Sequence, residues 1–466
     1  MTIEWPLLIV ALLLGFYAAW NIGANDVANA MGTSVGSRAL TLRQAVILAA
    51  IFEFGGAVLF GANVSETLQT GIVAPGAFGS DPMIFVHGMM AALLATGLWL
   101  QLATHFGLPV STTHAIVGAI VGFGVTVGGL GVVQWDHVLS IGLSWLASPI
   151  LGAAFGWLIF SLVRQLILYQ VSPLQATQKL LPFIVAAVAL VLSLGMTYEV
   201  VFRQGSSFLK IASCALFAIF AGAATFLYTK KIRPTKRVLV PVEPEILFKL
   251  RRVKDELMSV QESLSGEALF QMQDMIQEVD NFALAMERNL FSNSKNSEMV
   301  LVEKIFGYLQ ISSACLMAFA HGSNDVANAI GPMAAVISGV LHQPITPEAF
   351  PLWALILGGV GIVVGLATWG WKVIDTIGKH ITELTPTRGF SAEFGAALII
   401  LLASRFGFPI STTHTIVGAV FGVGFARGLS TLNLKIVRDI LLSWFVTIPI
   451  AAVLSFVCFW AIHSLF

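Results

Sequence analysis

Charged residues are scarce in this chain. Of 466 residues, 11% are Asp, Glu, Lys or Arg, whereas 57% are hydrophobic and the mean hydropathy is +0.86. A soluble domain has roughly a quarter of its residues charged, so a protein surrounded only by water is excluded and lipid is expected to be the main solvent. The 25 acidic and 25 basic residues balance, and the net charge therefore gives no reason to expect a nucleic-acid partner.

The chain also has little cysteine, no nucleotide-binding loop and no basic N-terminal segment. Its three cysteines lie far apart in apolar runs, which favours packed core residues over a metal cluster. No Gly-x-x-x-x-Gly-Lys-Ser/Thr stretch is present, so ATP does not drive the chain directly. The first apolar run contains Asn25 and Asp26 and follows no basic residues, so we do not expect a cleaved signal peptide.

Long apolar runs make up most of the sequence. A helix crosses about 30 Å of hydrocarbon with about 20 residues, and runs of about this length or longer lie at 6–37, 43–62, 138–163, 180–197, 209–229, 304–340, 351–377 and 437–462. Two more stretches, 83–127 and 389–426, are interrupted by Gly-x-Pro and are expected to form re-entrant hairpins. We predict an all-α polytopic membrane protein with about 10–12 transmembrane segments.

Two motifs occur twice, in the same order and at nearly equal spacing. Residues 24–32 read ANDVANAMG and 323–331 read SNDVANAIG, while 106–119 read FGLPVSTTHAIVGA and 406–419 read FGFPISTTHTIVGA. This pattern indicates a duplication. We therefore divide the chain into a first transmembrane repeat, connecting transmembrane helices, a polar helical loop and a second transmembrane repeat, at 1–165, 166–229, 230–303 and 304–466.

The basic residues favour one orientation. Lys and Arg gather in the 230–303 loop and near the segment ends on the same predicted side, whereas the loop 63–82 has acidic residues and no Lys or Arg. The positive-inside rule puts the 230–303 loop in the cytoplasm and the N-terminus outside. An odd number of crossings then separates the two Asn-Asp motifs, so the repeats have inverted topology, as in many secondary transporters.

The runs 6–37 and 304–340 place an Asp near their middle. A continuous helix of this length would be about 50 Å long, so a break, a steep tilt or a protruding end is needed. A carboxylate inside the bilayer costs several kcal/mol unless it has a partner or water, which makes Asp26 and Asp325 functional candidates. Asn at 25 and 29, and at 324 and 328, shares one helical face in each run.

Carboxylate and amide oxygens are the ligands of a small hard cation. The alternative is that these side chains only join helices together. Because the pair occurs twice, we favour a cation site formed by Asn25, Asp26, Asn324 and Asp325.

The second motif begins with Pro and three hydroxyl residues ahead of an apolar run, which is a helix-start signal. The first turn of such a helix has free backbone N–H groups and the positive end of the helix dipole, a combination that binds anions. Ordinary capping without a ligand is the alternative. The duplication favours a tetrahedral-anion site formed by Ser111, Thr112, Thr113, Ser411, Thr412 and Thr413.

Other polar residues in apolar runs are weaker candidates. For Glu53 and Glu393 three interpretations are open: binding a cation, carrying a proton or stabilising packing. His321 either acts in coupling or is a hydrogen-bonded structural residue. His114 and His414 either donate to phosphate or relay a proton, or they are hydrogen-bonded structural residues. His105 and Arg405 lie six residues before the Ser of each hydroxyl motif and are candidates for cationic help to the anion. For Arg405, a side chain that snorkels to the membrane surface is the stronger interpretation.

The paired motifs closely resemble those of the PiT (Pho4) family of inorganic phosphate transporters, over nearly the whole chain except 230–303. The resemblance implies inverted repeats of a twelve-helix type, a large cytoplasmic loop, homodimers, and symport of phosphate with sodium or protons. It implies that Asn25, Asp26, Asn324 and Asp325 coordinate the cation, that the six Ser and Thr residues cradle phosphate, and that Glu53 and Glu393 match important acidic positions.

The sequence therefore predicts a sodium-coupled importer of inorganic phosphate in a bacterial inner membrane, without a cofactor and without an enzyme activity. Proton coupling, transport of metal–phosphate complexes, and sulfate transport by a relative of the same family are the alternatives. A sensor that keeps the fold and signals through residues 230–303 is a further alternative from a different class.

Overall fold

The computed structural model describes residues 5–79, 81–200, 207–229, 244–261, 267–341, 350–374, 384–428 and 434–466. This part of the chain is almost entirely helical, with a single isolated β-bridge between Val73 and Val133. Ten of its helices are long and apolar enough to cross a membrane. A backbone in lipid must satisfy its own hydrogen bonds, which a helix does within one segment. The predicted all-α polytopic fold is confirmed.

The helices follow the apolar runs closely. Those of the first half and the connecting segment are α1 (Trp5–Gly36), α2 (Leu42–Thr70), α3 (Pro82–His105), α4 (Thr112–Phe123), α5 (Trp135–Val163), continued by η4 (Arg164–Leu168), α6 (Pro173–Val200) and α7 (Ser207–Thr229). In the rest of the described residues the α-helices are α8 (Pro244–Gln261), α9 (Glu267–Asp325), α10 (Ala327–Leu341), α11 (Leu352–Trp369), α13 (Pro386–Arg405), α14 (Thr412–Arg427) and α15 (Leu434–His463).

Both interrupted stretches fold back on themselves where the sequence predicts. Helix α3 ends before Gly107 and helix α13 ends before Gly407, and the two glycines have positive φ angles of 66° and 70°. Glycine adopts this conformation without the steric cost that a Cβ brings. The returning helix α4 has 12 residues and α14 has 16, which is shorter than a membrane crossing requires.

The two long runs accommodate their excess length differently. Helix α1 is an unbroken helix of 32 residues, so no break is present in the first run. In the second run α9 ends at Asp325 and α10 begins at Ala327, so the chain is interrupted at Val326, next to the candidate Asp. Helix α9 has 59 residues and begins far before the apolar run.

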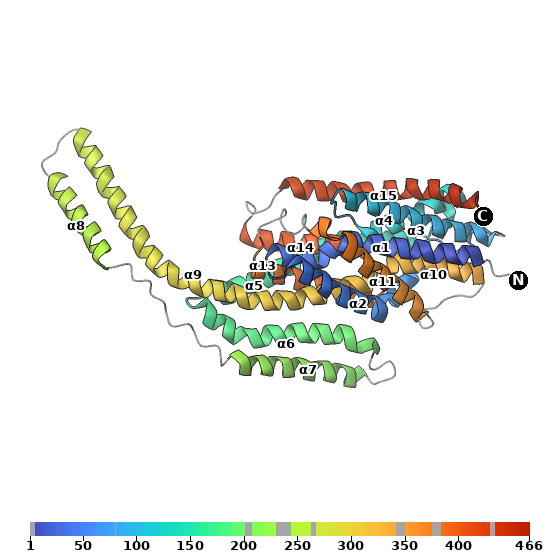
Figure 1. Ribbon diagram of the computed structural model, residues 1–466, viewed down its shortest axis with the longest axis horizontal. Helices are drawn as coiled ribbons and strands as arrows, with labels where there is room; N and C mark the ends of the chain where they lie inside the picture. The colour runs from blue at the N-terminus through green and yellow to red at the C-terminus, as the bar shows by residue number, and fades with distance from the viewer. Residues whose placement is uncertain are drawn as a thin grey trace.

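The predicted 230–303 loop is helical where it is described, whereas residues 230–243 and 262–266 lie outside the described residues. Helix α8 and the first part of α9 form an antiparallel pair, with Lys254 Nζ 2.6 Å from Asp280 Oδ1. This pair projects from one end of the molecule, and both chain termini lie at the other end (Figure 1). Because α9 continues unbroken to Asp325, the projecting pair and the candidate site share one helix.

The helices of the two halves pack against each other reciprocally. Helix α1 packs on α11 and α2 on α9, while α4 packs on α15 and α14 on α5. Figure 1 shows that α1 runs away from the end where the termini lie, whereas α9 and α10 run toward it. One buried apolar cluster includes residues from both halves, so the core belongs to the whole transmembrane part rather than to either repeat.

Candidate functional site

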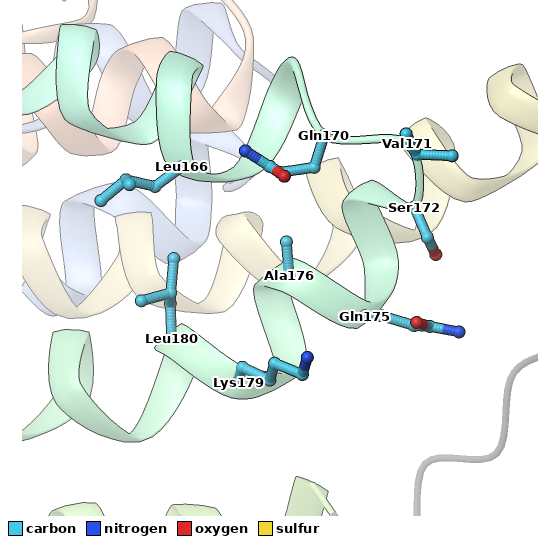
Figure 2. A pocket seen from close by; sticks show the side chains of 8 residues that line it. All are labelled: Leu166, Gln170, Val171, Ser172, Gln175, Ala176, Lys179 and Leu180. Carbon is cyan, nitrogen blue, oxygen red and sulfur yellow. The ribbon is translucent and has the colours of Figure 1, made fainter.

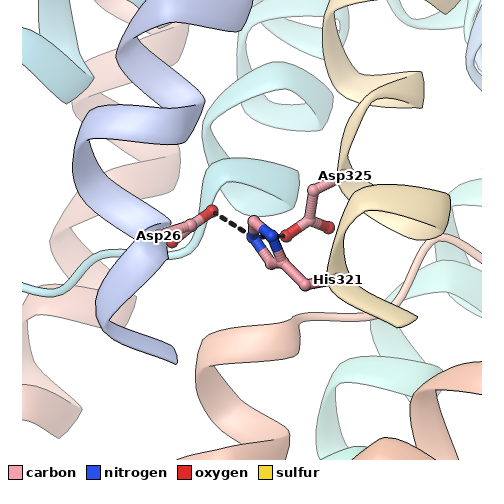
Figure 3. Close-up of side chains that lie close together, drawn as sticks. All are labelled: Asp26, His321 and Asp325. Carbon is pink, nitrogen blue, oxygen red and sulfur yellow. Dashed lines mark ion pairs between the residues drawn. The ribbon is translucent and has the colours of Figure 1, made fainter. Parts of the chain in front are cut away.

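The two acidic residues of the duplicated motif meet in the interior. Asp26 on α1 and Asp325 at the end of α9 are 1% and 0% exposed, and His321 between them is 0% exposed. The Nε2 atom of His321 lies 2.9 Å from Asp325 Oδ2 and 3.7 Å from Asp26 Oδ2. Figure 3 shows the three side chains pointing toward one another from α1 and α9. One ligand atom from each lies within 4.8 Å of the others.

The two hydroxyl motifs begin helices, as the sequence predicts. Ser111 is the N-cap of α4 and accepts a hydrogen bond from the backbone N–H of His114 at 3.2 Å, and Ser411 does the same for His414 at 3.2 Å on α14. The side chains of the two motifs are buried. Their positions at helix starts leave backbone N–H groups of the first turn without a partner inside the helix.

The carboxylates and the hydroxyls lie in one cluster. The amide of Asn29 donates to Asp26 Oδ1 at 2.9 Å and to Thr413 Oγ1 at 2.9 Å. The Thr412 hydroxyl donates to Asp325 Oδ2 at 2.6 Å. Asn29 and Asp26 belong to the first repeat and Thr413 to the second, so these contacts join the halves.

The other helix start makes the matching contact in the opposite direction. The amide of Asn328 on α10 donates to Thr112 Oγ1 at 3.1 Å and to Thr113 Oγ1 at 3.3 Å. Thr113 in turn donates to the backbone carbonyl of Ile410 at 3.0 Å. Each repeat therefore supplies amides to the hydroxyls of the other, and the duplicated motifs form one joint cluster.

Asn25 holds the turn between α3 and α4. Its amide donates to Thr104 Oγ1 at 2.9 Å and to the Leu108 carbonyl at 3.1 Å, while its oxygen accepts from the Val110 N–H at 3.2 Å. A cation bound by the Asn25 oxygen would therefore share that oxygen with Val110.

The amide nitrogen of Asn324 makes the equivalent contacts in the second half, whereas its oxygen has no hydrogen-bond partner among the described residues. Its amide donates to Ser404 Oγ at 3.1 Å and to the Phe408 carbonyl at 3.2 Å. The hydroxyls of Thr104 and Ser404 were not among the residues predicted from the sequence. The sequence could have indicated them, because each precedes the Ser of its hydroxyl motif by the same number of residues.

Several buried oxygens at the cluster have no hydrogen-bond partner within the described residues. Among them are Asp26 Oδ2, Asp325 Oδ1, Asn29 Oδ1, Asn324 Oδ1 and Asn328 Oδ1. Buried polar atoms are nearly always paired, and oxygens without a donor in a low-dielectric interior attract a cation. Asn29 and Asn328 share helical faces with Asn25 and Asn324. Their amides donate hydrogen bonds to the Thr hydroxyls of the opposite repeat.

The surroundings of the two Asp residues are not symmetric. Glu53 Oε2 on α2 lies 3.4 Å from His321 Nδ1, and both side chains are fully buried. The residue that precedes Asp26 by the same four positions is Ile22. A Cβ on Gly322 would lie 2.1 Å from the Glu53 carbonyl, and one on Gly23 would lie 2.0 Å from that of Ile362. Ile22 and Ile362 therefore lie beside Asp26 where His321 and Glu53 lie beside Asp325.

Glu393 lies in a separate hydrogen-bonded pocket. Its Oε1 accepts from the hydroxyls of Thr33 and Ser34, the latter at 2.6 Å, and from the Gln310 amide at 3.3 Å. Its Oε2 accepts from Ser313 Oγ at 2.6 Å. These donors come from α1 and α9, so Glu393 on α13 joins three helices. Its partners differ from those of Asp26 and Asp325.

The remaining candidates have other surroundings. The rings of His114 and His414 are 4.4 Å apart by their centroids, and each contacts a tryptophan, Trp145 at 3.9 Å and Trp444 at 3.5 Å. These imidazoles contact each other and the tryptophans. His105 and Arg405 are exposed, so the buried cluster does not include their side chains.

A polytopic helical protein with duplicated halves that share a buried cluster of carboxylates, amides and helix starts has the architecture of a secondary membrane carrier. A model of the phosphate transporter family matches residues 22–455. The chain therefore belongs to the phosphate transporter family, which confirms the resemblance found from the motifs.

Individual relatives agree with this assignment. The chain is 45% identical over 462 residues to a putative phosphate permease of Chlamydia muridarum, covering 99% of this chain and 100% of that one. It is 44% identical over 453 residues to the chloroplastic inorganic phosphate transporter 2-1 of Arabidopsis thaliana, covering 96% and 71%. A solved structure described as the sodium-dependent phosphate transporter matches with a TM-score of 0.76 and 35% identity, covering 99% and 100%. These relatives are permeases and transporters, which confirms the prediction that the chain is not an enzyme.

Proposed function

We propose that this protein imports inorganic phosphate together with sodium through the cluster shared by its two halves. The observation that carries the proposal is the juxtaposition of unpartnered Asp and Asn oxygens with two helix starts rich in hydroxyls. Oxygens without donors bind a hard cation, and helix starts with free N–H groups bind an anion. A cation and an anion bound side by side compensate each other's charge, so each stabilises the binding of the other.

Phosphate is the anion that fits this cluster. Ser111, Thr112, Thr113, Ser411, Thr412 and Thr413 supply hydroxyl groups, and the first turns of α4 and α14 supply backbone N–H groups. Thr412 already donates to Asp325 at 2.6 Å, so a bound anion lies close to carboxylates. A phosphate oxygen that carries a proton donates to such a carboxylate, whereas fully ionised sulfate has no proton to donate. This difference favours phosphate over sulfate.

Sodium is the coupling ion that the oxygen set supports. Asp26 and Asp325 supply charged oxygens, and Asn29 and Asn328 supply neutral ones. The solved relative is described as sodium-dependent, and that description supports the same ion for this chain. The roles of Asn25 and Asn324 as sodium ligands stay predictions, as do the coupling roles of Glu53, Glu393 and His321.

The direction of the helices supports alternating access by inverted repeats. Helix α1 and the α9–α10 pair run in opposite directions (Figure 1), and each half packs on the other. In this arrangement one hairpin would close the cluster from outside and the other from the cytoplasm. We place the N-terminus outside, residues 230–303 in the cytoplasm and the protein in a bacterial inner membrane as a homodimer.

Uptake by purified protein in liposomes tests the coupling ion. Labelled phosphate should accumulate inside when an inward sodium gradient is imposed, and choline in place of sodium should abolish accumulation. A protonophore should leave sodium-driven uptake intact. Uptake that persists in choline and disappears with a protonophore would assign the coupling to protons.

The same liposomes test the anion and the sensor alternative. Excess sulfate should leave phosphate uptake unchanged, and inhibition by sulfate would count against phosphate specificity. Absence of any phosphate uptake from correctly inserted protein would favour a sensor that signals through residues 230–303.

A further inference from the structure

A cavity of about 520 Å³ lies where α5 connects to α6, far along the chain from the Asp and Ser-Thr-Thr motifs. Figure 2 shows polar side chains on its wall, and among them are Gln170, Ser172, Gln175 and Lys179. Lys179 is exposed on the second turn of α6. The connection joins two membrane-spanning segments, so this cavity lies at the level where a bilayer meets water.

A second cavity of about 240 Å³ continues from the first along the spans. Leu166 and Leu180 line both cavities. The second cavity has apolar side chains from three helices, including Val163 on α5, Phe183 on α6 and Phe390 on α13. Together the two form one groove, polar at the end of the spans and apolar within the hydrocarbon.

Among the residues that line the polar end, Lys179 is the one with a charged side chain. Lys179 has no carboxylate within ion-pair distance in the part of the chain that the structure describes. The carboxylate of Glu298, close to this end, is already engaged, because Oε2 accepts from Ser172 Oγ at 3.0 Å and from the Leu174 N–H at 3.4 Å. A negatively charged group is the complement of an unpaired ammonium beside amide donors.

We propose that this groove binds one anionic phospholipid, with its headgroup at Lys179 and an acyl chain between α5, α6 and α13. The polarity and depth of the groove match an amphiphile in a bilayer rather than a soluble ligand. The acyl chain contributes little selectivity, because lipid tails surround the protein everywhere. Selectivity comes from Lys179, and a basic residue near the membrane surface favours an anionic headgroup about fivefold, which corresponds to about 1 kcal/mol.

The bound lipid would act on a helix that contacts the transport cluster. The groove ends on Phe390 and Phe394 of α13, whose rings stack at 5.6 Å. Glu393 lies between them in sequence and accepts hydrogen bonds from α1 and α9. An acyl chain against these rings supports the packing of α13, so we expect lipid binding to raise thermal stability.

Thermal unfolding of the purified full-length protein in detergent tests the proposal. We expect phosphatidylglycerol to raise the unfolding temperature more than phosphatidylcholine does, and native mass spectrometry to find it retained about fivefold better. Lys179→Gln should remove the preference for the anionic lipid. Ala187→Trp, which fills the apolar part of the groove, should reduce retention of both lipids.

Two matched variants serve as controls. Lys304→Gln removes an exposed lysine on α9 outside the groove, and Leu146→Trp enlarges a 66% exposed side chain of α5 outside it. Both should keep the wild-type lipid preference. All variants are first compared in phosphatidylcholine, where an unfolding temperature equal to that of the wild type shows that the fold is intact. A variant with a lowered unfolding temperature is judged by its lipid retention at a temperature where it is folded.

Three outcomes would overturn the proposal. The first is equal retention of the two lipids by the wild-type protein. The second is a Lys179-dependent stabilisation by inorganic phosphate without lipid, which would assign the polar cavity to the free anion. The third is conversion of a dimer to a monomer by Ala187→Trp, which would make the groove an interface between two copies of this chain.

Discussion

In the proposed function, coupled transport depends most directly on Asp26 and Asp325. Each has an oxygen without a hydrogen-bond partner, and each accepts a hydrogen bond at its other oxygen, from Asn29 to Asp26 and from Thr412 to Asp325. A carboxylate can therefore bind a cation with one oxygen while the other holds the cluster together. An amide in its place keeps the shape but removes the charge.

We predict that Asp26→Asn and Asp325→Asn each lower sodium-driven phosphate uptake at least tenfold. Hydrogen bonds and contacts to a charged group contribute about 1.5–3 kcal/mol, and the neutral amide loses that part of the binding energy for sodium. Initial uptake rates in liposomes at several sodium concentrations measure the effect. Asp136→Asn, at an exposed position on α5, is the matched control and should behave as wild type. Normal uptake after either change in the cluster would contradict a single site shared by both halves.

The serines at the helix starts should affect the anion more than the cation. Ser111 and Ser411 each cap a helix through one hydrogen bond of 3.2 Å, and the loss of an N-cap costs about 1 kcal/mol. We predict that Ser111→Ala and Ser411→Ala raise the KM for phosphate about fivefold and change the sodium dependence less.

The comparison for these serines is Ser140→Ala, whose exposed hydroxyl donates to the His137 carbonyl of its own helix. This variant should leave both constants unchanged. Phosphate titrations at saturating sodium, and sodium titrations at saturating phosphate, separate the two effects. A larger change in sodium dependence than in phosphate KM would place the serines on the cation instead.

At the scale of the helices, close approach of backbones brings the site residues together. Helix α9 touches α2 at Gly322, where a Cβ would lie 2.1 Å from the Glu53 carbonyl. Because the next residue toward the N-terminus is His321, the same contact brings the imidazole 3.4 Å from the Glu53 carboxylate. A side chain at Gly322 would separate the two helices at the level of the cluster.

We predict that Gly322→Ala lowers the free energy of unfolding by about 1–3 kcal/mol, measured as a lower unfolding temperature. Phosphate uptake should fall as well. Gly307→Ala on the same helix is the matched control, since a Cβ there meets nothing within 4 Å. Alanine favours the helix over glycine by about 1 kcal/mol, so Gly307→Ala should be neutral or stabilising. Equal effects of the two substitutions would show that helix propensity, and not the contact with α2, controls stability at Gly322.

At the scale of the molecule, the transmembrane core is built between the two repeats. Helix α4 packs on α15 and α14 on α5, and hydrogen bonds from Asn29 and Asn328 cross from each repeat to the other. Helix α8 and the first part of α9 project away from this core (Figure 1). Contacts between the repeats, more than the covalent link between them, should therefore hold the two repeats together.

We predict that a chain cut between Gln261 and Glu267 retains phosphate uptake when both fragments are produced together, and that neither fragment transports alone. The interlocking core should hold the fragments in one complex, which co-purification through a tag on one fragment measures. A cut inside a repeat, between Phe106 and Gly107, is the comparison. It should abolish uptake because that turn presents Ser111 to the cluster. Uptake by either fragment alone would contradict a site shared by both halves.

Most of the architecture could be predicted because a membrane restricts the choice of structure. The apolar runs matched α1, α5, α7 and α15 closely, since lipid leaves the backbone little alternative to helices. The Gly-x-Pro sequences marked both turns. Whether α1 would break could not be predicted, because tilt, protrusion and a break all accommodate excess length. Only the second run is interrupted, at Val326.

The amino-acid sequence by itself determined the helical class, the duplication and the pairing of Asp with hydroxyl helix starts, because polar groups inside long apolar runs are costly and repeated motifs are visible in the order of residues. Only the tertiary structure decided which amides reach which hydroxyls. Asn29 reaches Thr413 in the other repeat, whereas Asn25 holds Val110 in its own. Both Asn residues share one helical face, and the physical difference is which neighbouring helix lies against each turn of that face.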